Sequence, residues 1–164
     1  MTSPEISSNS RPWRAGALLA LLVTGLDQTS KWWIVTSVMV AERHIEVTSF
    51  FNIVMVWNRG ITFGLFGDSP ATTRWVLTGV AVIIVGILAV WMWQVSQRWV
   101  AYSLGAIIGG AVGNIIDRIY YGAVADFLDF HLFQWHWPAF NLADTAIVLG
   151  VAYLVLDAFI VVKE

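Results

Sequence analysis

The sequence predicts an all-α integral membrane protein whose main body is four transmembrane helices. Hydrophobic residues make up 58% of its 164 residues. Charged residues make up only 12%, about half the share that is usual in soluble domains. The chain has ten Trp residues, and Trp is enriched at membrane–water interfaces. These proportions exclude a disordered chain and a soluble globular domain, which needs more polar residues to cover its surface.

Composition also excludes several kinds of site. The formal net charge of −2 provides no basic patch, so we expect no nucleic-acid partner. Cysteine is absent, which excludes disulfides, a thiolate nucleophile and a thiolate metal site. The three histidines lack the His-Glu-x-x-His spacing of zinc sites, and no serine stands in a Gly-x-Ser-x-Gly setting. We therefore expect no metal and no cofactor.

The chain is expected to form a short disordered cytoplasmic tail over residues 1–14 and a single membrane-embedded domain over residues 15–164. The first predicted span covers residues 15–35. It begins as an uncharged apolar run, and Asp27 and Lys31 follow in its distal half. A cleavable signal peptide is the alternative, because the run has a basic start. No small-x-small cleavage site follows the run, which favours a retained span.

Three further spans are predicted, at residues 72–94, 98–118 and 141–162. Residues 75–93 form the clearest run, with 19 residues and no charge, and a helix of that length covers about 28 Å. The span at 98–118 is rich in Gly. Small residues let helices approach closely in lipid, so this span packs against either a neighbouring helix of the chain or a bound helix.

Two connections are long enough to carry structure of their own. Within residues 36–70, apolar residues alternate around residues 47–56 and 63–66, which predicts short strands. Residues 119–140 are rich in aromatic residues, but two acids and two histidines interrupt them. We expect this stretch to be an amphipathic interfacial segment rather than a fifth span.

Four spans place both termini on the same side of the membrane. Arg11 and Arg14 flank the first span, and Lys and Arg mark the cytoplasmic side. Both termini are therefore predicted to be cytoplasmic, and both long connections extracytoplasmic.

Acidic residues in or beside the apolar spans are the main functional signal. A charge at the centre of a membrane helix costs about 2.5–3.5 kcal/mol on insertion scales, and intramembrane ionisable residues are usually functional. Asp129 and Asp157 are expected to face water or headgroups. In the predicted topology, acids from three spans and one loop converge at a similar depth on the outer side. These converging acids are Asp27, Asp117, Asp126 and Asp144.

Each converging acid also has a structural interpretation. Asp27 and Lys31 are four residues apart on one helix face and can neutralise each other. Asp117 can pair with Arg118 at the end of its helix, or Arg118 can pair across to another acid. Asp144 is favoured near a helix N-terminus by the macrodipole.

Two carboxyl groups held together in a poorly solvated place can act as an acid–base catalyst. They share one proton, and the pair titrates with split pKa values. One member takes a proton from water while the other gives one to a carbonyl oxygen, and no cofactor is needed. The residues alone leave two other functions open: a small transporter or channel with the acids as a proton relay, and a structural subunit of a membrane complex.

Four sequence motifs occur in the polar parts of the chain. The first two are LDQTSK at residues 26–31 and WNRGITFG at residues 57–64. The third is GGAVGNIIDR with GAVADF, at residues 109–118 and 122–127, and the fourth is WPAFNLAD at residues 137–144. In this order they resemble the motifs of the lipoprotein signal peptidase (signal peptidase II) family, over about residues 15–162. Ile61 and Thr62 depart from the family, which more often has Ala there.

The resemblance implies a fold and an activity. The expected fold has four transmembrane helices, a small extracytoplasmic β-cradle and an amphipathic helix. The expected activity is that of an aspartyl endopeptidase of the bacterial cytoplasmic (inner) membrane, with its site at the extracytoplasmic face. It removes the signal peptide from diacylglyceryl-modified prolipoproteins, just before the lipid-bearing Cys. Membrane lipid and globomycin-type peptide inhibitors are the other expected partners.

The resemblance also implies roles for individual residues. Asp126 and Asp144 match the catalytic acids of the family and are named the catalytic pair below. The residues around them are implied to bind substrate or to support the site. These are Asp27, Lys31, Asn58, Gly60, Asn114, Asp117, Arg118 and Asn141.

Overall fold

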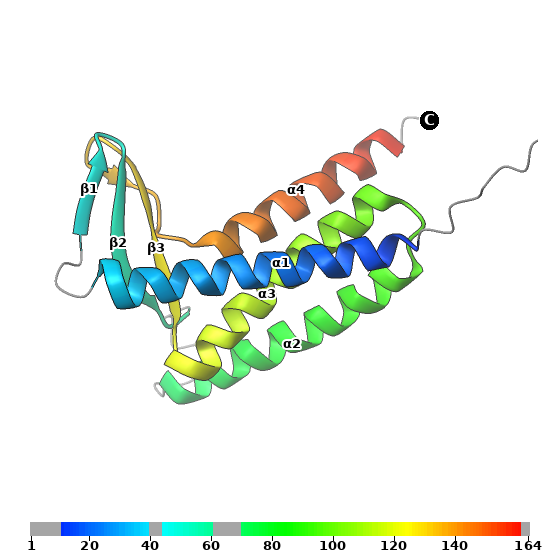
Figure 1. The fold of residues 1–164 in the computed structure, drawn as a ribbon, viewed down its shortest axis with the longest axis horizontal. Helices are drawn as coiled ribbons and strands as arrows, with labels where there is room; N and C mark the ends of the chain where they lie inside the picture. The colour runs from blue at the N-terminus through cyan, green and yellow to red at the C-terminus, as the bar shows by residue number, and fades with distance from the viewer. Residues whose placement is uncertain (1–10, 40–43, 61–69, 162–164) are drawn as a thin grey trace, which may run out of the picture.

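The structure, a computed structural model, describes residues 11–39, 44–60 and 70–161. Four long helices form a bundle, and a small sheet lies across one end of it (Figure 1). The first helix continues as a short π-helical turn over Ile34–Val38. The four helices are α1 (Pro12–Trp33), α2 (Pro70–Gln94), α3 (Arg98–Tyr121) and α4 (Leu142–Val161).

Three of the helices, α2, α3 and α4, are long and apolar enough to cross a membrane, and α1 is not among them. Large apolar side chains on the outer surfaces of α2 and α4 are exposed, for example Ile83 at 64% and Leu149 at 65%. Such a surface suits lipid better than water. The described residues therefore contain three candidate spans, and the fourth span stays a prediction.

Helix α3 lies at the centre of the bundle, because most of its apolar stretch is buried while α2 and α4 are largely exposed. Its glycines allow this packing. A Cβ on Gly105 would collide with the backbone oxygen of Gly16 in α1, and one on Gly110 would collide with the backbone oxygen of Ala143 in α4. The Gly-rich span therefore packs against neighbouring helices of the chain.

The sheet is antiparallel throughout, with strand order β1-β2-β3-β4. Asp126 lies opposite Val56, and a bulge between Ile53 and Val56 interrupts the pairing of the two central strands. The short strands predicted around residues 47–56 are confirmed, whereas residues 63–66 lie outside the described part of the chain. The strands are β1 (His44–Thr48), β2 (Phe51–Asn58), β3 (Val124–Leu132) and β4 (Trp135–His136).

The stretch over residues 119–140, predicted to be an amphipathic interfacial segment rather than a span, contains the end of α3 and the strands β3 and β4. Helix α3 runs on to Tyr121, where Gly122 adopts a φ of 80° and ends it, and β3 follows. A left-handed residue at this position is a common helix stop that glycine adopts without strain. The two acids that suggested contact with water are buried, with Asp126 at 1% and Asp129 at 6% exposure.

The predicted boundary of the N-terminal tail also needs correction. Helix α1 begins at Pro12, because proline is favoured in the first turn of a helix. Arg14 therefore belongs to the helix and not to a disordered tail. At the other end of the chain, α4 also finishes far from the sheet, so the two ends of the described fold lie at the same end of the bundle (Figure 1).

Candidate active site

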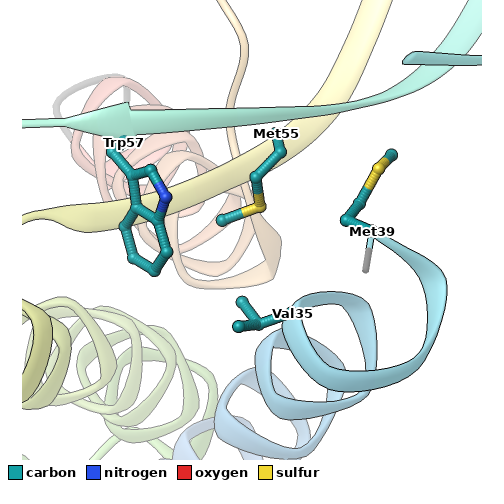
Figure 2. Close-up of a pocket in the computed structure, with 4 residues that line it drawn as sticks. All are labelled: Val35, Met39, Met55 and Trp57. Atoms are coloured by element: carbon teal, nitrogen blue, oxygen red, sulfur yellow. The ribbon is translucent and has the colours of Figure 1, made fainter. Parts of the chain in front are cut away.

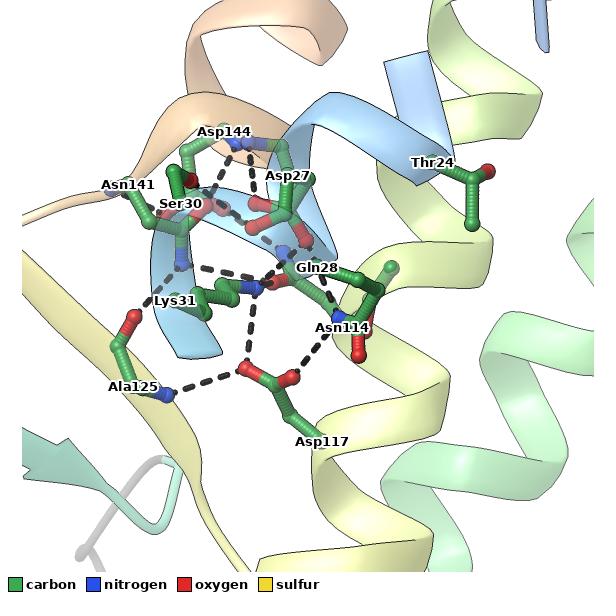
Figure 3. Close-up of polar contacts among 12 residues, drawn as sticks. Thr24, Asp27, Gln28, Ser30, Lys31, Asn114, Asp117, Ala125, Asn141 and Asp144 are labelled. Atoms are coloured by element: carbon green, nitrogen blue, oxygen red, sulfur yellow. Dashed lines mark hydrogen bonds and ion pairs between the residues drawn. The ribbon is translucent and has the colours of Figure 1, made fainter. Parts of the chain in front are cut away.

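A buried polar cluster lies where the helix bundle meets the sheet (Figure 3). It joins α1, α3, β3 and the start of α4, which are far apart in the sequence. Asp144 of α4 and Asn58 of β2 lie at its edge and are more exposed. The buried members are each at most 7% exposed, and they are Asp27, Lys31, Asn114, Asp117, Asp126 and Asn141.

Lys31 is at the centre of the buried charges. Its Nζ lies 2.8 Å from Asp27 Oδ2 and 2.8 Å from Asp117 Oδ2. The interpretation of Asp27 and Lys31 as a neutralising pair is confirmed, but the pairing of Asp117 with Arg118 is wrong. Lys31 also donates to Asn114 Oδ1 at 3.0 Å. A buried ammonium needs such partners, because an unpaired charge at low dielectric is strongly unfavourable.

The two acids bound to Lys31 hold the backbone on either side of the site. Asp27 Oδ1 accepts the backbone N–H of Ala143 at 3.0 Å. Asp117 Oδ2 accepts the backbone N–H of Ala125 at 3.1 Å. Each of these alanines directly precedes a member of the catalytic pair. The buried ion network therefore places the backbone of both acids.

Asp144 lies in the first turn of α4, where Asn141 caps the helix. The Asp144 backbone N–H donates to Asn141 Oδ1 at 3.0 Å, and the Asn141 backbone N–H donates to Asp144 Oδ2 at 3.3 Å. This reciprocal arrangement is a capping box, with Asn and Asp in the two positions. Asn114 Nδ2 donates to the other oxygen of Asp144 at 2.8 Å. Asp144 is therefore a helix N-terminal acid, as the sequence indicates, and both its oxygens receive N–H donors.

Asp126 lies on β3 and receives one amide on each oxygen. Asn141 Nδ2 donates to Oδ1 at 2.7 Å, and Asn58 Nδ2 donates to Oδ2 at 2.9 Å. Burial raises the pKa of Asp126 to about 6, and the charge of Asp144 adds to the rise, although the two amide bonds oppose it. Gly60 has a φ of 94° and donates its backbone N–H to Asn58 Oδ1 at 2.9 Å. That φ strains any residue with a side chain, so glycine is required to hold Asn58.

Asn141 connects the two acids, because its side chain binds Asp126 and its backbone binds Asp144. The charge of Asp144 also reaches Asp126. The arrangement thus brings together the four acids predicted to converge, two with Lys31 and two in the catalytic pair. Two carboxyls linked in this way can divide the roles of acid and base. In the described residues, no group of acids and histidines could hold a metal ion.

A hollow of about 150 Å³, lined by residues with apolar side chains, lies between β2 and the π-helical turn that follows α1. Met55 and Trp57 point from the strand toward Val35 and Met39 (Figure 2). Trp57 directly precedes Asn58. The hollow therefore lies next to the strand residue that binds Asp126.

Residues 19–160 match the family model described as Signal peptidase (SPase) II. The chain is 46% identical over 145 residues to a lipoprotein signal peptidase of Beijerinckia indica, covering 88% of this chain and 87% of that protein. The chain belongs to the signal peptidase II family. It is also 45% identical over 146 residues to the lipoprotein signal peptidase of Vibrio cholerae, covering 86% and 84% of the two chains. A solved bacterial membrane enzyme, 27% identical, superposes with a TM-score of 0.76 over 88% of this chain and 92% of that one.

Membership of the signal peptidase II family decides between the three functions that the residues alone leave open. The chain is a peptidase of the aspartic type and not a transporter or a structural subunit. The matched residues include the whole polar cluster, with Asp126 and Asp144. Residues 61 and 62, where the chain departs from the family, lie outside the described residues.

Arg118 of this signal peptidase II chain is partly buried beside the cluster. Its Nη1 donates to the backbone oxygen of Asn114 at 3.2 Å. Among the described residues no carboxyl lies within ion-pair distance of it, so the prediction that it pairs with an acid is wrong. The acids still act on it at longer range, and they are Asp144, Asp117 and Asp126.

Two polar residues of α1 in the site were not predicted. Gln28 Nε2 donates to Asp117 Oδ1 at 2.9 Å, and Thr24 Oγ1 donates to the backbone oxygen of Gly109 at 2.9 Å. With Asp27 and Lys31 they follow an i, i+3, i+4, i+7 spacing, which places them on one helix face. That spacing is the signal that could have identified them.

The prediction that Asp129 faces water or headgroups is also wrong. Asn52 Nδ2 donates to Asp129 Oδ2 at 2.9 Å, and His136 Nδ1 lies 2.9 Å from the same oxygen. Burial favours the neutral form, but the bonds from Asn52 and His136 outweigh it and lower the pKa of Asp129 below its ordinary value. Asp129 thus holds the far part of the sheet, outside the catalytic pair.

Proposed function

We propose that Asp126 and Asp144 are the catalytic pair with which this chain cleaves prolipoproteins. As a member of the signal peptidase II family, the chain is a peptidase that removes signal peptides from prolipoproteins. The observation that supports the assignment is the hydrogen-bonded link through Asn141, which binds both acids. One proton can then be divided between two carboxyls at the edge of the bundle.

The surroundings of the two acids support different roles. Burial favours the protonated form of Asp126, with a pKa of about 6, which suits the acid that protonates the carbonyl oxygen of the scissile peptide. Asp144 is more exposed than Asp126 and lies in the first turn of α4, where the helix dipole favours a carboxylate, which suits the group that takes a proton from water. After attack, the proton taken by Asp144 can be given to the leaving amine. No cofactor takes part.

The location of the site supports a finer proposal about the membrane. We infer that α1 is the fourth span, because its charged residues Asp27 and Lys31 pair with each other, and Lys31 also pairs with Asp117, inside the bundle. The enzyme resides in the bacterial cytoplasmic membrane with both termini in the cytoplasm and the catalytic pair at the outer face. Both ends of the described fold lie opposite the sheet, in agreement with this arrangement (Figure 1).

The substrate is inferred to be a diacylglyceryl-modified prolipoprotein, cut just before the lipid-bearing Cys. A substrate with acyl chains and an apolar signal helix must be cleaved at the membrane surface, where the end of the bundle would lie. The hollow beside Trp57 is lined by residues with apolar side chains, which suit an apolar group of the substrate. Membrane lipid surrounds the helices, and globomycin-type peptide inhibitors are expected to compete at the same site.

The test uses the purified full chain in detergent with two substrates. One is a diacylglyceryl-modified prolipoprotein, and the other is the same protein with the lipid-acceptor Cys replaced by Ser. We expect a gel shift for the lipidated substrate alone, and mass spectrometry should place the new N-terminus at the modified Cys. Absence of cleavage, or equal cleavage of both substrates, would contradict the proposed substrate.

A further inference from the structure

Groups that can only donate a hydrogen bond set the direction of all three asparagine amides in the site. Asn114 Oδ1 faces the Lys31 ammonium at 3.0 Å. Asn141 Oδ1 and Asn58 Oδ1 each face a backbone N–H, at 3.0 and 2.9 Å. An ammonium and a backbone N–H have no acceptor lone pair, so an amide oxygen must face them. Each amide nitrogen is then left to point at a carboxyl of the catalytic pair.

Lys31 is the only one of these three fixed donors that is a side chain. Asn141 Nδ2 also reaches Asn114 Oδ1, at 3.3 Å, but its shorter bond, at 2.7 Å, goes to Asp126 Oδ1. Its ammonium is 1% exposed, between Asp27 and Asp117 (Figure 3). In the described structure it makes no hydrogen bond to Asp144. Its effect on that acid passes through Asn114, which accepts from Lys31 and donates to Asp144 Oδ1 at 2.8 Å.

We propose that Lys31 is a positioning residue for the catalytic pair, which fixes Asn114 so that Asp144 always meets an N–H and remains a proton acceptor. The inference rests on the proposed function of the pair. Without Lys31, only the longer contact from Asn141 Nδ2 still reaches Asn114 Oδ1, and the amide can turn over and present its oxygen to Asp144. An amide oxygen pairs only with a protonated carboxyl, and a protonated carboxyl cannot take a proton from water.

Other charges around Asp144 must be separated from this effect. Asp126 on β3 faces it, and the cluster behind it contains Asp27 and Lys31 on α1 and Asp117 and Arg118 on α3. Removing the ammonium leaves two buried carboxylates without their cation. A pure charge effect and an effect of amide direction therefore need different variants.

The experiment measures kcat/KM against pH for lipidated prolipoprotein cleavage, with the wild type and Lys31→Met. For Lys31→Met we expect the midpoint of the acidic limb of this pH profile to move upward by about one pH unit. On that limb, kcat/KM then falls about tenfold relative to wild type. The matched control is Gln28→Met. Gln28 bonds to Asp117 and to Gly113 in the same network but has no bond to Asn114, so Tm should fall while the midpoint stays in place.

A double variant, Lys31→Met with Asp117→Asn, removes one positive and one negative charge from the buried group of Asp27, Lys31 and Asp117. The formal sum stays at −1, because two carboxylates and one ammonium become one carboxylate. For the folded fraction of this double variant we expect the same upward shift of the midpoint. An unshifted midpoint in a folded variant overturns the inference, and so does a double variant that does not fold, since Lys31 would then support only the fold. Failure of the wild type to cleave would instead contradict the proposed function.

Discussion

At the scale of single residues, the setting of Asp126 favours its neutral form. Its pKa rises from 3.8 to about 6 through burial, with the charge of Asp144 adding to the rise. The folded carboxyl therefore keeps a proton that the unfolded chain loses between about pH 4 and 6. For an acid whose pKa is raised by folding, the contribution to stability is fully present below about pH 4. It is lost as the pH rises through about 6.

The first prediction concerns Asp126→Asn. The Asn side chain cannot ionise, so the variant does not lose this stability as the pH rises. We expect the Tm of the variant, relative to wild type, to rise by about 5 °C between pH 4 and pH 7. Thermal melts in detergent across that range measure it. A Tm difference that does not change with pH would contradict the assigned cause.

The second prediction separates substrate chemistry from support of the fold at Asn58, which is exposed and donates to Asp126. We expect Asn58→Ala to melt almost normally, because Asn58 is exposed, but to lose about tenfold or more in kcat/KM, because Asp126 loses the amide that orients one of its oxygens. Asn52→Ala is the matched control, since Asn52 is buried on the same strand and donates to Asp129. That variant should lose Tm and keep its activity per folded molecule. The opposite pattern would show that Asn58 supports the fold.

At the scale of elements, the catalytic pair depends on how closely α4 packs against α3. A Cβ on Gly110 would meet the Ala143 backbone oxygen and, at 2.9 Å, Ile147 Cγ1. Ala143 directly precedes Asp144. Separation of the two helices would therefore displace one member of the pair.

The third prediction is that Gly110→Ala lowers both stability, by about 1–3 kcal/mol, and kcat/KM. Gly86→Ala on α2 is the control, because nothing lies within 4 Å of its added Cβ. The control should be neutral or slightly stabilising, as alanine favours helix over glycine. Equal effects of the two substitutions, measured by thermal melts and cleavage rates, would argue against close α3–α4 packing.

Many of the helices and strands could be predicted from the sequence. Uncharged apolar runs mark the long helices, and alternation marks β1 and β2. Strand β3 was not predicted because Asp126 and Asp129 look like residues exposed to water. Their burial depends on Asn58 and Asn52 of the facing strand, and the pairing of two strands separated by two helices cannot be read from local pattern.

The candidate site, too, could be predicted from the sequence only in part. The convergence of the four acids could be predicted, because topology alone sets their depth. Their partners could not, since Asp117 pairs with Lys31 of another helix and not with the adjacent Arg118. The direction of each amide follows from three-dimensional contacts such as that of Asn114 with Lys31.

At the scale of the whole molecule, the fourth prediction concerns orientation in the membrane. Arg11 and Arg14 lie at the start of α1, at the end of the bundle where α4 also ends (Figure 1), and basic residues favour the cytoplasm. Reporter fusions at the C-terminus should therefore report the cytoplasm, and a fusion near residue 68 should report the outside. A C-terminal reporter active only outside the cell membrane would mean that α1 is not a span.

The central claim is that Asp126 and Asp144 act as one catalytic unit, and the cleavage of a diacylglyceryl-modified prolipoprotein by purified variants tests it most directly. Wild type, Asp126→Asn, Asp144→Asn and the double variant are compared at equal amounts of folded protein. Each single variant should lose about a thousandfold or more in kcat, and the double variant should be little worse, because the two carboxyls share one task. A folded single variant with near-normal turnover, or losses that multiply in the double variant, would contradict the claim.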